Sequence, residues 1–464
     1  MSKGLAGLTP YPPRRQAYYT AFIVFTVTLF SFLDRQVLAI LVDPIRHELH
    51  ATDTGMSLLY GFAFVFLYST LGIPIGRLID RRQRRLILAA GVAVWSLATI
   101  ACGLAQDYWT LFAARMCVGI GEACLTPAAC SLLADCFQPR VRGRAMSFYL
   151  MGVYGGIGLS MVMGGLLYDV LLHSSPLPLI GGLTPWRQIF IIIGAPGLLI
   201  SALVLTMKEP ARQDVEPLLP AAGADPLPPA PELLAYMRAN IAVIATVLLA
   251  HGLLAFVSYG LMGWAPSVLM REFHQTRGVV GLTLGLLSLA GGIVGALSGS
   301  FICDRWTASG VKAAKFKVCA VGAGLAAVGL AILPFAAAPW AAVAAITLCI
   351  TALPFASASG QTMVQELFPN RLRGQGSAMT VLMIGLFGAG GGPLVVGLLS
   401  DHVFHKAGLS MAIVSAALPA AAVVIVLYLV GRNGYEALRG RVLPAEPTPV
   451  AAPDGLAMPL PRPV

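Results

Sequence analysis

Long apolar runs recur along this chain, and each is about as long as a helix that crosses a membrane. Because a helix needs about 20 apolar residues to cross the hydrocarbon core, the runs predict twelve transmembrane helices. The first six are predicted at residues 17–42, 57–77, 86–106, 109–136, 144–172 and 186–207. The second six are predicted at residues 240–269, 279–302, 314–335, 339–366, 375–400 and 410–431. The pattern therefore predicts an all-α integral membrane protein.

A proline-rich segment separates the two groups of six helices. It contains seven prolines and cannot form a span, so we expect a loose cytoplasmic linker with a short helix near residues 231–238. The residues after 431 are also rich in proline and alanine, which predicts a cytoplasmic, disordered tail. The predicted regions are a cytoplasmic N-terminal segment, a first bundle, the linker, a second bundle and the tail, at residues 1–16, 17–207, 208–239, 240–431 and 432–464.

The two groups of helices also share short motifs. Four motifs of the first group recur in the second group, in the same order and at nearly constant spacing. They are Arg140-Val-Arg142-Gly143 with Arg371-Leu-Arg373-Gly374, Gly165-Leu-Leu-Tyr-Asp169 with Gly397-Leu-Leu-Ser-Asp401, Asp135 with Glu366, and Asp80-Arg81 with Asp304-Arg305. Parallel six-helix repeats with a midplane site between them are an architecture of secondary transporters.

Composition agrees with the membrane prediction, since 57% of the 464 residues are hydrophobic and only 11% are charged. The net charge of +10 could indicate nucleic acid, but the distribution of the basic residues favours a membrane orientation instead. Of the 31 lysines and arginines, the side opposite the termini holds only Arg46, Arg187, Arg271, Arg277 and Lys406. The positive-inside rule then places both termini in the cytoplasm of a cell, with a bacterial inner membrane as the expected location.

Charged residues inside the apolar runs are the strongest functional signal. Asp34 and Arg35 lie within the first predicted span, and Arg115 and Glu122 lie within the fourth. An ionisable residue at this depth costs about 2.5 kcal/mol or more, and it usually faces a bundle interior or a cavity with a partner. Neighbours in sequence point in different directions on a helix, so Asp34 and Arg35 each need a partner on another helix. We predict a neutral quartet in which Arg35 pairs with Glu122.

The quartet has a structural and a functional interpretation. As a structural cluster it would only join the first and fourth spans. As a binding site it would let the anionic group of a substrate compete for Arg35, after which Glu122 would take up a proton. His251, near the middle of the seventh span, is a second candidate proton carrier, although packing explains a single histidine equally well.

Charged residues also gather at the cytoplasmic ends of the predicted helices, and several belong to the repeated motifs. One interpretation is an ordinary solvated helix end, and the other is a latch that closes the cytoplasmic side. The repetition favours the latch. Its predicted members are Asp80, Arg81, Arg84, Asp135, Asp304, Arg305 and Glu366.

The segment Gly72-Ile-Pro-Ile-Gly-Arg-Leu-Ile-Asp-Arg-Arg-Gln-Arg-Arg85 resembles the loop 2–3 signature of the major facilitator superfamily, with Gln83 where that signature commonly has glycine. Within the superfamily, Phe32-Leu-Asp-Arg-Gln36 and Val118-Gly-Ile-Gly-Glu-Ala123 resemble the Spinster-like branch. The resemblance implies the twelve-helix major facilitator fold and proton-linked transport of lysophospholipids or sphingosine phosphate. It also implies that the quartet matches the charged residues inside the membrane domain of that branch.

Other classes of function find little support. No Walker sequence is present, and no cluster of His, Asp or Ser typical of a membrane-embedded, lipid-modifying enzyme is found. The ligands of a zinc helix stand at i and i+4, and His47 and His50 do not have that spacing. We therefore expect a monomeric secondary transporter with no cofactor or metal, whose partners are protons, the lipid bilayer and an amphipathic anion. A small organic anion or a drug-like compound is the alternative substrate.

Overall fold

The computed structural model describes residues 11–173, 178–213, 230–369, 372–405 and 408–442. The described chain is almost entirely helical, and twelve of its helical segments are long and apolar enough to cross a membrane. The twelve predicted spans are therefore confirmed. Each span is helical because a helix pairs its own main-chain N–H and C=O groups, as a bilayer requires. The apolar side chains of each run allow that helix to cross the hydrocarbon core.

The first six spans form the N-terminal half, and several are built from more than one helix. They comprise α1 (Arg14–Glu48), α2 (Asp53–Ser57) with the π-helix η1 (Leu58–Phe62) and α3 (Ala63–Arg81), α4 (Arg84–Leu104), α5 (Tyr108–Glu122) with α6 (Leu125–Cys136), α7 (Pro139–His173) and α8 (Pro185–Leu205).

The second six spans form the C-terminal half. They comprise α10 (Ile241–Arg271), α11 (Arg277–Ala308), α12 (Ala314–Ile332) with the 3-10 helix η2 (Leu333–Phe335), α13 (Pro339–Ser357) with α14 (Gly360–Leu367), α15 (Arg373–Met383) with the π-helix η3 (Ile384–Gly391) and α16 (Gly392–His402), and α17 (Leu409–Val442). The short helix expected in the linker is α9 (Ala230–Ala239). Helix α17 continues to Val442, so it includes residues that the sequence pattern assigns to the tail.

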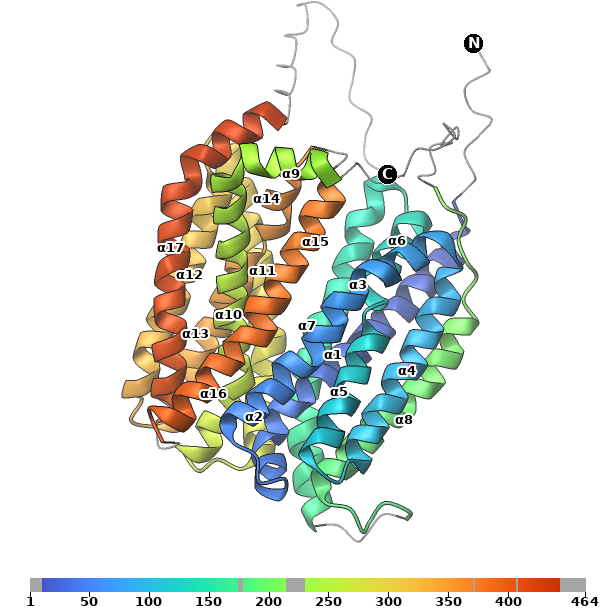
Figure 1. Cartoon of the computed structure of the whole chain (residues 1–464), viewed down its shortest axis with the longest axis vertical. Helices are drawn as coiled ribbons and strands as arrows, with labels where there is room; N and C mark the ends of the chain where they lie inside the picture. The colour runs from blue at the N-terminus through green and yellow to red at the C-terminus, as the bar shows by residue number, and fades with distance from the viewer. Residues whose placement is uncertain (1–10, 174–177, 214–229, 370–371, 406–407, 443–464) are drawn as a thin grey trace, which may run out of the picture.

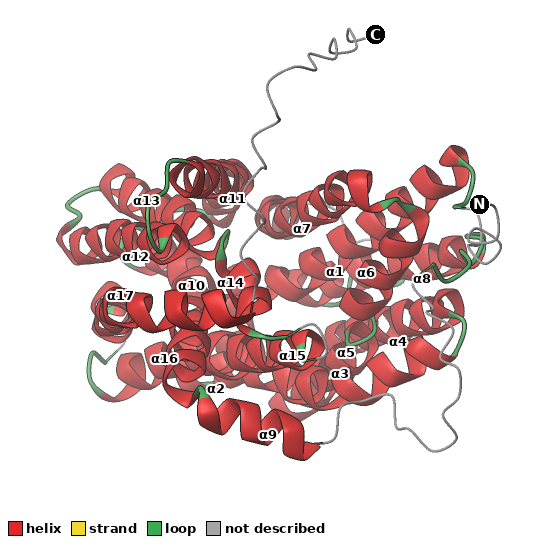
Figure 2. Ribbon diagram, turned by 90° about the horizontal axis from the view of Figure 1, so that it is seen from above, coloured by secondary structure: helices red, strands yellow, loops and turns green. Residues whose placement is uncertain are grey.

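The two halves stand side by side, which is plain when the bundle is viewed along its helices (Figure 2). We call the end that carries the start of α1 and the end of α17 the terminal face, and the other end the opposite face. The halves lie close together toward the opposite face and diverge toward the terminal face (Figure 1). Helix α7 packs along α11, and α2 and η1 pack against α16 and η3.

Close contact between the halves depends on a residue without a side chain at Gly61. This glycine lies in η1, and a Cβ there would overlap the main-chain carbonyl oxygen of Ala389 in η3. Both segments are π-helical, a geometry that often marks functional positions inside a longer helix. The contact brings the middle of the second span directly against the middle of the eleventh.

The fourth span is interrupted at its centre. Helix α5 ends at Glu122, two residues form a turn, and α6 begins at Leu125. Pro127 lies in the first turn of α6, where a helix tolerates proline because no hydrogen bond to a preceding turn is required. The interruption fixes Glu122 at the end of a helix in the middle of the membrane domain.

Candidate functional site

The predicted pair of Arg35 and Glu122 is confirmed. Arg35 Nη2 donates to Glu122 Oε2 at 2.5 Å, and Arg35 Nε donates to the same oxygen at 3.2 Å. Ser31 lies one turn before Arg35 on α1, and its hydroxyl also donates to Glu122 Oε2, at 2.8 Å. One carboxylate oxygen thus accepts from two side chains of α1, which ties the first span to the break in the fourth.

The other two members of the quartet form a second, weaker pair beside the first. Arg115 Nη1 lies 3.6 Å from Asp34 Oδ1, too far for a hydrogen bond but close enough for an ion pair. Thr99 on α4 donates its hydroxyl proton to Asp34 Oδ2. Arg115 Nη2 donates to the main-chain oxygen of Arg35 at 3.3 Å. The structure therefore brings all four predicted residues together.

Several polar atoms of this cluster are buried without a hydrogen-bond partner in the described structure. They are Asp34 Oδ1, Glu122 Oε1, and Nε and Nη1 of Arg115. A buried polar atom left without a partner costs roughly 1–3 kcal/mol. Asp34 Oδ1 and Glu122 Oε1 therefore each retain the capacity to accept a hydrogen bond.

Arg35 is the member of the quartet that remains accessible. Its side chain is 13% exposed, whereas those of Asp34, Arg115 and Glu122 are between 0 and 3% exposed. Its guanidinium carbon lies 4.2 Å from the ring centroid of Phe64, 4.8 Å from that of Phe32 and 5.2 Å from that of Tyr68. Aromatic faces attract cations at this range. A cation surrounded by aromatic rings can accept an anion that carries an apolar body.

The contacts made by Ser31, Thr99 and the aromatic residues around Arg35 were not predicted from the sequence. Ser31 had a usable signal, because a residue four positions before Arg35 lies on the same helix face. Thr99 and Phe64 belong to other spans, and nothing in the sequence relates their depth to that of Asp34 or Arg35.

His251 lies apart from the quartet, on α10. Its Nδ1 pairs with the main-chain oxygen of Val247 at 2.8 Å, and its ring packs edge-on against Tyr428 with 6.4 Å between centroids. The imidazole also fills the space over Gly360, where a Cβ would overlap Nε2. These contacts are those of a packed residue within the C-terminal half, and a proton-carrying role stays a prediction.

At the terminal face, two predicted acidic gating residues form equivalent ion pairs, each within one half. Asp135 pairs with Arg84 at the start of α4, and Glu366 pairs with Lys315 at the start of α12. The two basic residues are separated by the same number of positions as the two acidic ones, so the pairs are related by the internal repeat. In this conformation neither pair joins the halves, and their part in a latch stays a prediction.

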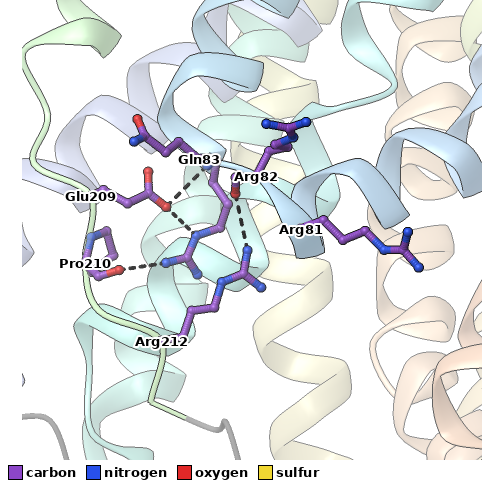
Figure 3. A pocket seen from close by; sticks show the side chains of 7 residues that line it. Arg81, Arg82, Gln83, Glu209, Pro210 and Arg212 are labelled. Carbon is purple, nitrogen blue, oxygen red and sulfur yellow. Dashed lines mark hydrogen bonds and ion pairs between the residues drawn. The ribbon is translucent and has the colours of Figure 1, made fainter. Parts of the chain in front are cut away.

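The remaining gating candidates make fewer contacts. The side chain of Asp80 lies outside the described part of the structure. Arg81, Asp304 and Arg305 are exposed at helix ends. Arg81 lines a surface pocket of about 390 Å³, but its side chain points away from the other labelled residues (Figure 3).

That pocket shows that the beginning of the linker is fastened to the N-terminal half. Glu209 Oε1 accepts from Arg84 Nε at 2.7 Å, and the main-chain oxygen of Pro210 accepts from Arg84 Nη2 at 2.8 Å (Figure 3). Gln213 donates its main-chain N–H to Asp135 at 3.0 Å. The sequence indicated a loose linker from its proline content, and this part of that expectation is wrong. Acidic and main-chain groups of residues 209–213 hold it against α4 and α6.

At the opposite face, an ion-pair cluster joins the two halves. Arg271 at the end of α10 binds Asp53 through two hydrogen bonds of 2.8 and 3.0 Å, and Asp43 through one of 2.7 Å. Arg46 adds an ion pair to Asp53 at 3.6 Å. The sequence indicated Arg46 and Arg271 only as outer charges, because it does not show which loops meet. This face is closed by charge pairing across the halves.

Comparisons with known proteins agree with this architecture. Residues 24–393 match the sequence profile described as Major Facilitator Superfamily. An MFS-type efflux pump of Mycolicibacterium smegmatis is 28% identical over 404 residues, which cover 85% of this chain and 87% of that protein. Protein spinster homolog 1 of Homo sapiens is 26% identical over 426 residues, which cover 86% of this chain and 76% of that protein.

Two solved structures show a similar fold. One is a bacterial homologue of the human lysosomal transporter Spinster in an inward-facing, unoccupied conformation, with a TM-score of 0.76 and 24% identity over 94% of this chain and 100% of that chain. The other is a D-xylose–proton symporter, with a TM-score of 0.68 and 16% identity. The match covers 88% of this chain and 97% of that chain.

Proposed function

The chain belongs to the major facilitator superfamily, and we propose that this secondary transporter moves an amphipathic anion such as a lysophospholipid, coupled to protons, by alternating access. The observation that carries the proposal is the position of Arg35. It is the accessible member of a buried, neutral quartet, and three aromatic rings surround its guanidinium.

Arg35 supplies the charge that recognises the anion. A phosphate or carboxylate can form two parallel hydrogen bonds with a guanidinium, which makes arginine well suited to such groups. The aromatic rings beside it offer faces to an acyl chain or another apolar body. Phe64 belongs to α3, and α3 packs against η3 of the C-terminal half, so a ligand at this position would lie near the boundary between the halves.

Glu122 supplies the coupling to protons. While Arg35 is bound to it, the carboxylate is stabilised by the opposite charge and by the Ser31 hydroxyl. An anion that takes Arg35 removes that stabilisation from a fully buried carboxylate, which then favours its protonated form. Anion and proton each strengthen the binding of the other by the same factor, as thermodynamic linkage requires.

The C-terminal half supplies an apolar wall with few charges. Its spans carry small and apolar side chains with scattered hydroxyls and amides, among them Ser258, Thr283, Ser288, Ser357, Ser359, Gln361 and Thr380. A site that is charged on one wall and apolar on the other suits a ligand with one anionic end. The distribution of lysine and arginine supports cytoplasmic termini in a bacterial inner membrane. With that orientation, closure at the opposite face and divergence at the terminal face correspond to an inward-facing state.

A small organic anion or a drug-like compound is the second candidate substrate. The relative from Mycolicibacterium smegmatis is named an efflux pump, and the charge of Arg35 would serve such a solute equally well. The aromatic rings favour the lysophospholipid, because a small hydrophilic anion would leave them without a contact.

Transport into proteoliposomes tests the proposal. The protein is reconstituted, a proton gradient is imposed, and the movement of labelled lysophosphatidylglycerol is followed against lysophosphatidylcholine and against an aromatic carboxylate. We expect gradient-dependent movement of the anionic lysolipid, and none by the Arg35→Ala variant. Movement of the aromatic carboxylate alone would favour the second candidate, and equal rates with and without the gradient would contradict proton coupling.

A further inference from the structure

The repeated motif Gly-Leu-Leu-x-Asp has a structural role that the substrate site does not explain. One copy lies near the end of α7 at residues 165–169, and the other lies near the end of α16 at residues 397–401. Both copies lie toward the opposite face, and each contacts the beginning of a span in the other half.

The aspartate of each motif accepts hydrogen bonds from the first main-chain N–H groups of that span. Asp401 Oδ2 accepts from the N–H of Thr54 at 2.7 Å, and its Oδ1 accepts from that of Asp53 at 3.2 Å. Asp169 Oδ2 accepts from the N–H of Gly278 at 2.9 Å. The second half therefore caps a helix of the first, and the first half caps a helix of the second.

The two capped positions are equivalent in the duplicated chain. Thr54 and Gly278 are separated by the same number of positions as the Asp-Arg pairs at residues 80–81 and 304–305. The two pairs of contacts are thus related by the same internal repeat as the helices that carry them.

The fourth residue of each motif contacts the side chain of the residue that directly precedes Thr54 or Gly278. Ser400 donates its hydroxyl proton to Asp53 at 2.8 Å, and the ring centroid of Tyr168 lies 4.4 Å from the guanidinium carbon of Arg277. Asp53 and Arg277 are themselves equivalent positions, because they directly precede Thr54 and Gly278. The chemistry of this contact differs between the copies, but its position is the same.

The glycine of each motif allows the two helices to approach. A Cβ at Gly397 would lie 2.7 Å from the main-chain oxygen of Asp53, and one at Gly165 would lie 3.0 Å from the Cα of Gly281 and overlap the main-chain oxygen of Arg277. Residues four apart share one helix face, so glycine and aspartate act on the same helix beginning. The glycine gives the space and the aspartate makes the bond.

We propose that the two motifs form a reciprocal pair of clamps that hold the opposite face closed, and that both release when the transporter opens toward that face. The beginning of a helix has N–H groups without partners and a positive partial charge, so a carboxylate stabilises it. Opening removes two carboxylates from two helix ends together. The ion pair of Arg271 with Asp53 strengthens only the clamp that contains Asp401.

Hydrogen–deuterium exchange of the full-length protein in lipid nanodiscs tests this proposal without any substrate. Removing a helix cap weakens a closed state by about fivefold in its equilibrium constant. We expect Asp169→Ala or Asp401→Ala to speed exchange at residues 53–57 and 277–281 by about fivefold, and the double variant by roughly 25-fold, since the clamps share no residue. Exchange at residues 78–85 and 302–309 should slow, because the terminal face closes as the opposite face opens.

Glu272→Ala is the matched control. Glu272 also caps a helix at the opposite face, through the N–H of Ser410 at 2.7 Å, but both residues belong to the C-terminal half. It should speed exchange only around residue 410. Asp169→Asn and Asp401→Asn retain a hydrogen-bond acceptor without the charge. They should change exchange at the same residues as the Ala variants, but by a smaller factor. Unchanged exchange at residues 53–57 and 277–281, or faster exchange at both faces together, would overturn the proposal.

Discussion

The two halves descend from one six-helix pattern, yet they differ in what they place at the middle of the membrane. The N-terminal half holds two carboxylates and two arginines in contact. In the C-terminal half, the candidate proton carrier His251 is a single buried residue that packs against Gly360 and Tyr428. The buried charges of the described quartet thus belong to the N-terminal half, and in the proposed mechanism the C-terminal half supplies the apolar wall that faces them.

At the two faces the halves are far more alike. Arg84 with Asp135 and Lys315 with Glu366 repeat at the terminal face, and the two motifs ending in aspartate repeat at the opposite face. The contacts at both faces thus follow the internal repeat, whereas the charged quartet lies in the N-terminal half.

The largest expected effect comes from removing the accessible charge of the N-terminal half. Arg35→Ala loses the group that binds the anion and leaves the buried Glu122 without its partner. We expect affinity for lysophosphatidylglycerol to fall at least about 30-fold, as for truncation of a buried charge pair. Tryptophan-fluorescence or calorimetric titration measures it. Lys312→Ala, which removes an exposed charge of the C-terminal half, is the control and should change affinity little. An equal loss of affinity in both variants would contradict a specific role of Arg35.

The next effect compares the equivalent ion pairs at the terminal face. Arg84 is 1% exposed and binds both Asp135 and Glu209, whereas Lys315 is 16% exposed and its partner Glu366 is 18% exposed. We expect Arg84→Ala to lower the free energy of unfolding by roughly 3 kcal/mol and Lys315→Ala by about 1 kcal/mol or less. Thermal unfolding in the same detergent compares the two variants. A larger loss for Lys315→Ala would contradict the ranking by burial.

A smaller effect comes from Glu122, and it separates anion binding by the quartet from the coupling of that binding to a proton. Glu122→Gln keeps the shape and a hydrogen-bond acceptor but cannot take up a proton. The wild-type affinity for the anion should fall with rising pH by up to about tenfold per unit where one proton is linked. The variant should bind the anion with little pH dependence. Affinity measured from pH 5 to pH 9 decides this, and a profile as steep as that of the wild type would make Asp34 or His251 the better candidate.

The smallest expected effect is that of His251→Gln. Among the described residues, the imidazole bonds to Val247 and packs against Tyr428, both in its own half, and its Nε2 is buried without a hydrogen-bond partner. Since His251 lies apart from the quartet, we expect the pH profile of anion affinity to stay within about twofold of the wild type, as for a substitution away from the binding site. The same titrations measure it. A flattened profile would move proton coupling into the C-terminal half and reverse the comparison.

Much of the fold follows from the sequence. Twelve apolar runs give twelve spans, and the likeness to the major facilitator superfamily and its Spinster-like branch is confirmed by the family match and by the Spinster relatives. The Arg35–Glu122 pair was also predictable, because full charges inside apolar runs must find partners and few are available. The break of the fourth span at Glu122 was not predicted, although Gly121 before it and Pro127 after it are residues that often mark helix ends.

Contacts that depend on tertiary placement could not be predicted. The linker residue Glu209 binds Arg84, but a proline-rich segment has no periodicity that would indicate a docked position. Arg271 and Asp53 are far apart in the chain, and their loops meet only because the two halves close at that face. The motifs ending in Asp169 and Asp401 are recognisable in the sequence as marks of duplication, but their capping role is visible only in the structure.

The central claim is that an anion on Arg35 makes Glu122 take up a proton, and counting protons during binding tests it most directly. Purified protein in weakly buffered detergent near pH 7 is mixed with lysophosphatidylglycerol, and a pH-sensitive dye reports proton uptake per bound molecule. We expect uptake approaching one proton per bound anion for the wild type and none for Glu122→Gln, with binding retained. No uptake by a wild-type protein that binds the anion, or equal uptake by the variant, would contradict the account.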